Sequence, residues 1–393
     1  PDKRIEKILE NLCPRAIVAD RESREHVESI VDELAKAEGF DRPQIFIAED
    51  ISSFEQVACA DSNCKISESA GDSVTDSEND MLATVRRQMS MTDPLYIIYT
   101  SGSTGNPKGV MTSHLSLMTY INAYCDVMHI EESDVLGNQS PLDYIAAIRD
   151  IYLPLKTGCS TAIIPKEYFM EPNALFDYMN DKKVSSVGWS VSAFTILTSL
   201  GAFEEVGLKS LRKICFSGSV MPCRVLRKWQ ENLPEAHFVN QYGPTEATAS
   251  CTYYSVDHTV EEDEVLPIGK AYDNYRVFLI DEHGNEPAVG EQGEICVCGP
   301  ILALGYYNDP ERTAAAFTLN PLNRAYPERM YRTGDYGRLD EDGILHFCGR
   351  MDRQIKHMGH RVELDEVEHA ANVVDGVAES CVIYNKAKEV LIL

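Results

Sequence analysis

The sequence lacks the long apolar runs that membrane insertion requires. No stretch approaches the ~18 consecutive apolar residues of a transmembrane helix, and the first residues, PDKRIE, lack the apolar core of a signal peptide. We therefore expect neither a membrane span nor export. Basic residues are also scarce, since 36 Lys and Arg stand against 62 Asp and Glu, for a formal net charge of -26. Because such a surface repels phosphate backbones and anionic lipids, the sequence disfavours nucleic-acid and membrane partners.

Cysteine motifs for zinc are missing as well. The twelve cysteines are scattered, and neither Cys59 with Cys64 nor Cys296 with Cys298 forms the paired C-x-x-C knuckles of a zinc site. Several cysteines, such as Cys215, lie in apolar runs, which is typical of buried free thiols in a reducing compartment. We therefore expect a cytoplasmic protein.

The sequence is long enough to form more than one domain. Its 393 residues exceed a typical domain of about 150 residues at least twofold, and its composition is that of a globular protein. Helix and strand patterns alternate to about residue 250, interrupted at 61–92 by a Ser-, Asp- and Glu-rich stretch that we interpret as a linker. Short strands with Gly-containing turns follow at 265–350. We predict a large α/β domain at 1–350 with a β-rich subdomain at about 257–350, and the start of a small α+β domain at 351–393.

One loop concentrates hydroxyls, glycines and a lysine directly after a predicted strand. Residues 99–109 are YTSGSTGNPKG. Backbone N–H groups, hydroxyls and a cation in one loop can surround a polyphosphate. The loop is not a Walker loop, because Pro107 precedes Lys108 where that motif requires glycine. A flexible Ser/Gly connector is the alternative interpretation.

With this loop and four later strings, the sequence resembles the adenylate-forming (ANL) superfamily: acyl-CoA synthetases, luciferases, and the adenylation domains of nonribosomal peptide synthetases. The later strings occur in the order of that family: NQYGPTE at 240–246, GE at 293–294 with GYY at 305–307, YRTGD at 331–335, and GRMD at 349–352 leading to Lys356. The string GHRVELDEVE at 359–368 is closest to nonribosomal adenylation domains and D-alanine–carrier protein ligases. The resemblance covers essentially the whole chain.

The resemblance implies an activity as well as a fold. It implies ATP-dependent activation of a carboxylic acid, with an amino acid as the expected class, to an acyl-adenylate with release of pyrophosphate. Transfer to the phosphopantetheine thiol of an acyl or peptidyl carrier protein would follow, with ATP and Mg²⁺ as the cofactors. An acyl- or aryl-CoA ligase is the alternative enzyme. A non-catalytic nucleotide-binding module is the alternative from another class.

The resemblance also assigns residues to the nucleotide. The β- and γ-phosphates would be held by residues of the loop at 99–109, namely Thr100, Ser101, Gly102, Ser103, Thr104, Gly105 and Lys108. Thr245 would touch the α-phosphate, and Glu246 would bind Mg²⁺, because a carboxylate is a hard ligand for a hard cation. Tyr242 would offer a flat face to adenine, Asn240 a hydrogen-bonding edge, and Asp335 an acceptor for both ribose hydroxyls. Arg350 would support the ribose or a phosphate. Gly218 and Gly243 complete the predicted nucleotide contacts.

The predicted catalytic set is Thr100, Lys108, Thr245 and Glu246, together with His114. The alternative for His114, which follows the phosphate loop, is a capping or packing role. Tyr120 and Tyr124 lie four residues apart on one helical face, and we expect them in the core rather than at a ligand.

The substrate region departs from the amino-acid branch of the family. In that branch an Asp binds the α-ammonium, and Ile145 stands at the matching position here. Asp143 could serve an amine displaced from its usual position, or it could be a helix N-cap. Together with Gly218 and Tyr242, these two residues are the predicted substrate contacts. Ser219 also replaces a Glu of the family.

The C-terminal part carries the predicted hinge. By resemblance Asp352 is the hinge of the small domain, and the basic run at 356–361 approaches the pantetheine thiol. The family extends before Pro1, and its adenylation-catalysing lysine lies beyond Leu393. We therefore expect the small domain to be truncated here.

Overall fold

The computed structural model describes residues 2–393 with gaps. Outside the description are positions 1, 38, 52–75, 102–105, 143, 351–353, 358–359, 365–366, 369–370, 372–376, 378–379 and 386–389, and the side chains at 51, 76–80, 82, 356–357 and 360–361. The chain divides into two compact units, Pro1–Asp93 and Pro94–Leu393. Within the described part, no helix has the length and apolar character that crossing a bilayer requires.

The first unit combines helices with a two-stranded parallel sheet. Its elements are α1 (Asp2–Leu12), β1 (Ala16–Ala19), α2 (Arg24–Leu34), β2 (Gln44–Ile47), α3 (Ala48–Ile51) and α4 (Asp76–Gln88). Apolar residues spaced three and four apart on α1 and α2 face each other, so that Leu9, Ile30, Val31 and Leu34 form a small buried core.

The helix α4 corrects one prediction from the sequence. The stretch at 61–92 was expected to be a linker, but 13 of its residues form α4. The sequence of α4 begins with acidic residues and ends with Arg86 and Arg87 in its last turn. Acidic residues at the start of a helix and basic residues at its end interact favourably with the helix dipole. This charge order was the sequence signal for α4, since its apolar periodicity is weak.

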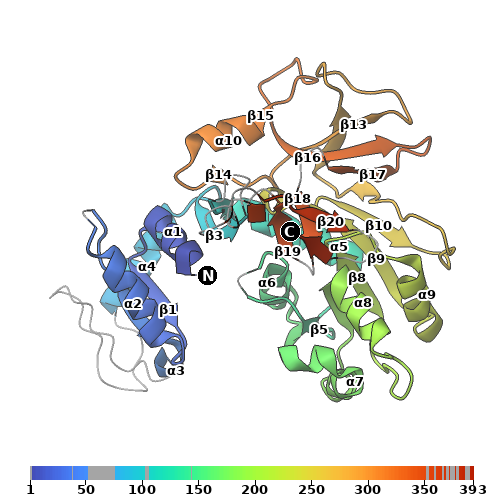
Figure 1. Cartoon of the computed structure of the whole chain (residues 1–393), viewed down its shortest axis with the longest axis horizontal. Helices are drawn as coiled ribbons and strands as arrows, with labels where there is room; N and C mark the ends of the chain where they lie inside the picture. The colour runs from blue at the N-terminus through green and yellow to red at the C-terminus, as the bar shows by residue number, and fades with distance from the viewer. Residues whose placement is uncertain are drawn as a thin grey trace. The chain divides into compact units, whose positions relative to one another are not determined.

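The second unit is built on a seven-stranded sheet of order β11-β10-β9-β8-β7-β5-β6 (Figure 1). Its strands are β5 (Val135–Asn138), β6 (Ser160–Ile163), β7 (Ser186–Ser190), β8 (Lys213–Ser217), β9 (His237–Tyr242), β10 (Thr252–Val256) and β11 (Lys270–Ala271). Strands β5 to β9 are parallel, and β10 and β11 are antiparallel to their neighbours. Helical connections join the parallel strands: α6 (Ala147–Thr157), η1 (Lys166–Met170), α7 (Pro172–Asp181), α8 (Val191–Ser199) and α9 (Cys223–Asn232). The alternation predicted from the sequence is thus confirmed, and Figure 1 shows α8 and α9 packed side by side next to this sheet.

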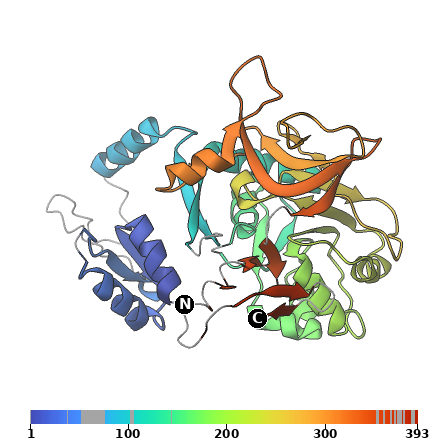
Figure 2. The same cartoon turned by 45° about the horizontal axis from the view of Figure 1, so that its top comes forward.

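The later strands form a five-stranded antiparallel sheet. They are β12 (Arg276–Ile280), β13 (Gln292–Cys298), β15 (Phe317–Leu319), β16 (Arg329–Leu339) and β17 (Leu345–Arg350). The register shifts between Glu294 and Cys296 and between Tyr336 and Gly337. Such bulges bend strands, and Figure 2 shows the orange strands of this sheet strongly curved. The sheet lies within the predicted β-rich stretch, whereas the domain boundary at 350 stays a prediction.

A smaller sheet of order β14-β4-β3 contains the two strands on either side of the Ser/Gly-rich loop in the 99–109 string. Its elements, with the adjoining helices, are β3 (Pro94–Thr100), β4 (Lys108–Ser113), α5 (His114–Met128), η2 (Thr245–Ala247), β14 (Gly305–Tyr306) and α10 (Pro310–Ala316). Strands β3 and β4 are antiparallel, and Thr100 pairs with Lys108. Two further hairpins follow, β18 (Gln354–His357) with β19 (His360–Glu363) and β20 (Ile383–Asn385) with β21 (Val390–Ile392).

One buried cluster of the second unit joins α5 to both larger sheets. Tyr120 and Tyr124 of α5, Val239 of β9 and Ile295 of β13 all belong to it. Both tyrosines are 1% exposed, so their predicted place in the core is confirmed. The ten described cysteines are free, and seven of them are buried, as the apolar sequence around them predicted.

Candidate active site

The structure brings Lys108 to Glu246, although 138 residues separate them. The Nζ of Lys108 donates to Oε1 of Glu246 at 2.9 Å and contacts the hydroxyl of Tyr306 at 3.2 Å. The Tyr306 hydroxyl donates to the same carboxylate oxygen at 2.8 Å. Glu246 is fully buried, and the Lys108 side chain is only 11% exposed. Because a buried carboxylate needs a counter-charge and donors, Lys108 and Tyr306 together stabilise the ionised form of Glu246.

Tyr306 stays a neutral hydrogen-bond donor in this arrangement. Burial raises the pKa of its phenol far above the ordinary value, and the negative charge of Glu246 raises the pKa further. The hydroxyl therefore keeps its proton at physiological pH and can donate to the carboxylate. The sequence placed Tyr306 in the string GYY but gave it no role, because only the pairing of β14 with β4 brings it beside Lys108.

A sterically constrained turn presents Thr245 and Glu246 after strand β9. Thr248 and Ala249, directly after η2, have positive φ values of 44° and 76°. A Cβ on Gly243 would lie 2.4 Å from the Cα of Ser250, so this position admits only glycine without a backbone shift. A left-handed backbone conformation is strained for residues other than glycine, and such strained residues cluster at functional sites. The turn is therefore a rigid support for the two side chains.

Asp335 is the second buried carboxylate of the region. It is 5% exposed, the Tyr242 hydroxyl donates to its Oδ2 at 2.5 Å, and Nη1 of Arg350 donates to its Oδ1. Asp335 and Arg350 face each other across β16 and β17. Burial, followed by the charge of Asp335, raises the pKa of Tyr242 well above its ordinary value. Tyr242 thus contacts Asp335 through its hydroxyl and lies only four residues before Glu246 in the sequence.

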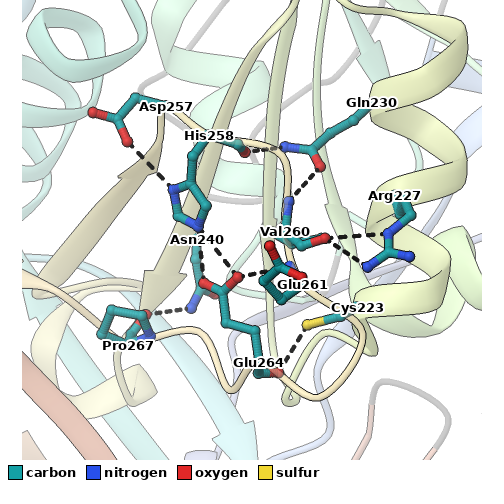
Figure 3. Close-up of polar contacts among 10 residues, drawn as sticks. All are labelled: Cys223, Arg227, Gln230, Asn240, Asp257, His258, Val260, Glu261, Glu264 and Pro267. Atoms are coloured by element: carbon teal, nitrogen blue, oxygen red, sulfur yellow. Dashed lines mark hydrogen bonds and ion pairs between the residues drawn. The ribbon is translucent and has the colours of Figure 1, made fainter.

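Asn240 is oriented by a loop that follows strand β10, as Figure 3 shows. Its Nδ2 donates to the carbonyl of Pro267 at 2.8 Å. This contact fixes the amide plane, so that the amide oxygen and the amide nitrogen have different neighbours. Asn240 itself is 7% exposed. A fixed amide at the end of a buried strand can distinguish a donor from an acceptor on a bound base.

Helix α9 holds this loop in place (Figure 3). Arg227 donates from Nε and Nη2 to the carbonyl of Val260 at 3.1 and 2.9 Å, and Gln230 Nε2 donates to the carbonyl of His258 at 2.8 Å. Nε2 of His258 lies 3.0 Å from Oε1 of Glu264. The hydrogen bond to Glu264 is the main reason that the pKa of His258 is raised. The loop is therefore tied to the protein at several points before it reaches Asn240.

The remaining predicted residues lie as follows. The hydroxyl of Thr100 is buried and has no partner among the described residues, and Ser101 is 6% exposed. Gly218 follows β8 with a φ of 99°. His114 is the first residue of α5, but the cap of that helix is Ser113, whose Oγ accepts from the backbone N–H of Ser116.

Some predicted residues cannot be placed. Gly102, Ser103, Thr104, Gly105, Asp143 and Asp352 lie outside the described residues. Ile145, by contrast, is 6% exposed and belongs to the buried cluster around α5. Its side chain therefore lies in an apolar environment rather than at an exposed surface.

The chain has relatives of known family. Residues 1–307 match the family described as AMP-binding enzyme. The D-alanine–D-alanyl carrier protein ligase of Bacillus cytotoxicus is 36% identical over 286 residues, which are 72% of this chain and 55% of that protein. The ligase of the same name from Bacillus anthracis is 37% identical, over 72% of this chain and 56% of that protein. The chain thus spans a little over half the length of these curated relatives.

Solved structures share its fold. The Vibrio cholerae adenylation domain AlmE, in complex with glycyl-adenosine-5'-phosphate, superposes with a TM-score of 0.76 at 22% identity, over 98% of this chain and 70% of that chain. NpsA-ThdA, an artificially fused adenylation-PCP di-domain from Klebsiella oxytoca, superposes with a TM-score of 0.75 at 20% identity, over 100% of this chain and 70% of that chain. The predicted α/β fold class is confirmed. Because the family match covers well over half of the chain and includes both strands of the β3–β4 hairpin and the turn with Glu246, the chain belongs to the AMP-binding enzyme family.

Proposed function

We propose that this protein activates a carboxylic acid of the amino-acid class with ATP as an acyl-adenylate, with release of pyrophosphate. It then transfers the acyl group to the phosphopantetheine thiol of a carrier protein. The observation that carries the proposal is the buried contact of Lys108 with Glu246 and Tyr306. In attack of a carboxylate on the α-phosphorus, catalysis is mainly positioning and charge neutralisation, and no protein nucleophile is required. A paired cation and carboxylate at the end of a Ser/Gly-rich hairpin suits that task.

The hairpin residues would hold the phosphates. Lys108 supplies a cation, and Thr100 supplies a buried hydroxyl that has no partner among the described residues. A buried hydroxyl without a partner is rare in proteins, and a phosphate oxygen would satisfy it. Thr245, in the turn after β9, would contact the α-phosphate.

Glu246 would hold the Mg²⁺ that accompanies ATP. Its carboxylate is a hard oxygen ligand, and among the described residues no group of three or more His, Cys, Asp and Glu could hold a metal ion without other ligands. This fits Mg²⁺, which is commonly bound through one or two carboxylates together with phosphate oxygens and water. The bound ion would neutralise phosphate charge.

The other buried carboxylate would bind the ribose. Asp335 can accept hydrogen bonds from both ribose hydroxyls, and Arg350 holds it in place. The ring of Tyr242 offers a flat surface to adenine. Because Nδ2 of Asn240 donates to Pro267, its amide oxygen is the atom we assign to the amino group of adenine. Gly218, where no atom lies within 4 Å of an added Cβ, would leave room beside the nucleotide, and Gly243 would permit the tight turn that carries Thr245 and Glu246.

The acceptor is assigned by similarity. Both ligases from Bacillus are named for a carrier protein, and one of the solved neighbours is an adenylation-PCP fusion. On this basis we propose a carrier protein rather than free coenzyme A, with Asp352 as the hinge between the two half-reactions. The predicted cytoplasmic location is supported by the free cysteines of the described part.

ATP–pyrophosphate exchange across a panel of carboxylic and amino acids tests the first half-reaction. Exchange that depends on both acid and Mg²⁺ is expected. A second assay offers the activated acid to a phosphopantetheinylated carrier protein and to coenzyme A, and we expect thioester only on the carrier. Nucleotide binding without exchange for any acid would instead support the non-catalytic alternative.

A further inference from the structure

A buried arginine on α6 has a donor without a hydrogen-bond partner. The side chain of Arg149 is only 3% exposed. Its Nε forms an ion pair with Oδ1 of Asp150 at 3.4 Å, but it has no hydrogen-bond partner among the described residues. Asp150 is also held by Asn138, whose Nδ2 donates to Oδ2 at 2.9 Å. Because a guanidinium has five N–H donors and burial removes their water, an acceptor is missing at this position.

Strand β7 leaves room for this guanidinium. A Cβ on Gly188 would lie 2.4 Å from both Cζ and Nε of Arg149, so the guanidinium packs directly against the backbone at Gly188. The ring of Tyr124 on α5 also contacts it, with 5.7 Å between Cζ and the ring centroid. The arginine is therefore held between a strand and a helix, and its orientation is fixed before any ligand binds.

Two more polar atoms nearby are buried without a hydrogen-bond partner. The Tyr124 hydroxyl contacts Sγ of Cys215 at 3.5 Å, and that sulfur contacts Oε1 of Gln241 at 3.3 Å, while Nε2 of Gln241 has no partner among the described residues. The hydroxyl of Tyr120 makes no hydrogen bond of ordinary geometry among the described residues; burial raises its pKa to about 12, although the nearby Arg149 and Ser250 lower it. We call Tyr120, Tyr124, Arg149, Cys215 and Gln241 the Arg149 cluster.

The atoms without a hydrogen-bond partner are all able to donate. The Nε of Arg149 and the Nε2 of Gln241 can only donate, and a neutral tyrosine hydroxyl can donate or accept. Buried polar atoms are nearly always paired, and each one left unpaired destabilises the fold. Three in one cluster therefore indicate a bound group that is rich in acceptor oxygens. A carboxylate fits best, because it accepts several hydrogen bonds at once and pairs with a guanidinium in two-point geometry.

The cluster lies on elements that also carry predicted residues of the acid site. Ile145, a predicted substrate contact, lies four residues before Arg149, and the chain is helical from Ala147. Gln241 precedes Tyr242 on β9, the strand that leads into the turn with Thr245 and Glu246. Ligands of open parallel sheets bind in the crevice at the carboxyl ends of the strands, and Gln241 lies near that end of β9.

We propose that the Arg149 cluster binds a second carboxylate of the acid substrate, so that the substrate is a dicarboxylic acid or an acidic amino acid. This inference rests on the proposed function and names its substrate class. One carboxylate is activated beside Thr245 and Glu246, while the other is bound by the guanidinium of Arg149 and the amide of Gln241.

Equilibrium binding tests the inference without requiring catalysis. Calorimetry on the full-length protein, with and without a non-hydrolysable ATP analogue, would compare succinate, glutarate and adipate with their monoamides and with the monocarboxylic acids of the same length. Aspartate, glutamate and 2-aminoadipate with their side-chain amides form the second series. We expect at least one dicarboxylate to bind about tenfold or more tightly than its amide, because a charge-assisted pair is replaced by a neutral contact.

Variants assign that preference to the arginine. In Arg149→Met the preference for the dicarboxylate should fall to about one, while the neutral analogues keep their affinity. Gly188→Ala retains the charge but displaces the guanidinium, and it should reduce the preference as well. Arg212→Met is the matched control, because Arg212 pairs with Asp134 and should leave the preference unchanged. If Arg149→Met does not fold, Arg149→Lys decides, since it keeps the charge and loses the two-point geometry.

The outcomes separate this inference from the proposed function. If the parent binds every dicarboxylate no better than its amide, or if the arginine variant keeps the preference, the inference is wrong. ATP–pyrophosphate exchange that occurs only with acids lacking a second carboxylate would leave the proposed function intact and overturn the substrate class. Arg149-dependent binding of a dicarboxylate without any exchange would support the cluster and contradict the proposed function.

Discussion

The ammonium of Lys108 and the carboxylate of Glu246 lie 2.9 Å apart, with Glu246 fully buried. Replacing Glu246 by Gln should leave the fold in place and reduce Mg²⁺-dependent adenylate formation by about 2 kcal/mol or more, since a neutral amide is a weak partner for a dication. Pyrophosphate exchange over a Mg²⁺ titration measures this effect. An unchanged Mg²⁺ dependence would exclude the metal-binding role.

Replacing Asp335 by Ala should weaken ATP binding by roughly 1.5–3 kcal/mol, because a charged acceptor for ribose hydroxyls is removed. The variant should then distinguish ATP from deoxy-ATP poorly. Nucleotide affinities of parent and variant for both compounds provide the measurement. Full discrimination in the variant would assign Asp335 a purely structural role beside Arg350 and Tyr242.

Replacing Gly243 by Ala should destabilise the protein by about 1–3 kcal/mol, because the new Cβ overlaps the backbone at Ser250. The turn with Glu246 should move, so exchange should fall as well. Gly207→Ala is the control, since no atom lies within 4 Å of a Cβ there. Equal melting temperatures for the two variants would contradict this account of the turn.

The contact of His258 with Glu264 predicts a pH dependence of stability. The pKa of His258 is raised in the folded protein, chiefly by its hydrogen bond to Glu264. The stabilisation is therefore complete below the unfolded value of about 6.5 and is lost as pH rises through the higher folded value. The melting temperature of His258→Gln should fall below that of the parent near pH 6, and the difference should shrink toward pH 8.5. A difference that stays constant from pH 6 to pH 8.5 would contradict this account.

Much of the fold follows from local patterns in the sequence. The alternation of helices and strands from α5 to β9 and the short strands β12 and β13 were predicted from periodicity, because their buried faces repeat at helical or strand spacing. Helix α4 was not predicted, because its apolar periodicity is weak and only the charges at its ends indicate a helix. Pairing between distant strands has no such local signal.

The residue types of the candidate site were determined by the sequence itself. The string at 99–109 indicated a loop after a strand, with Lys108 and several hydroxyls that could surround a polyphosphate, and the string at 240–246 named Asn240, Tyr242, Thr245 and Glu246. These segments are short and their chemistry is local, so the sequence was sufficient to name them.

Only the tertiary structure decided which of these groups meet. Tyr306 reaches Glu246 because β14 pairs with β4, and Arg149 comes to lie against Gly188 because α6 packs on β5, the neighbour of β7 in the sheet. Both contacts are made by residues far apart in the chain, where burial removes water and each polar atom must find a partner inside the protein. Sequence spacing cannot specify such partners, since they are selected by the packing of the whole unit.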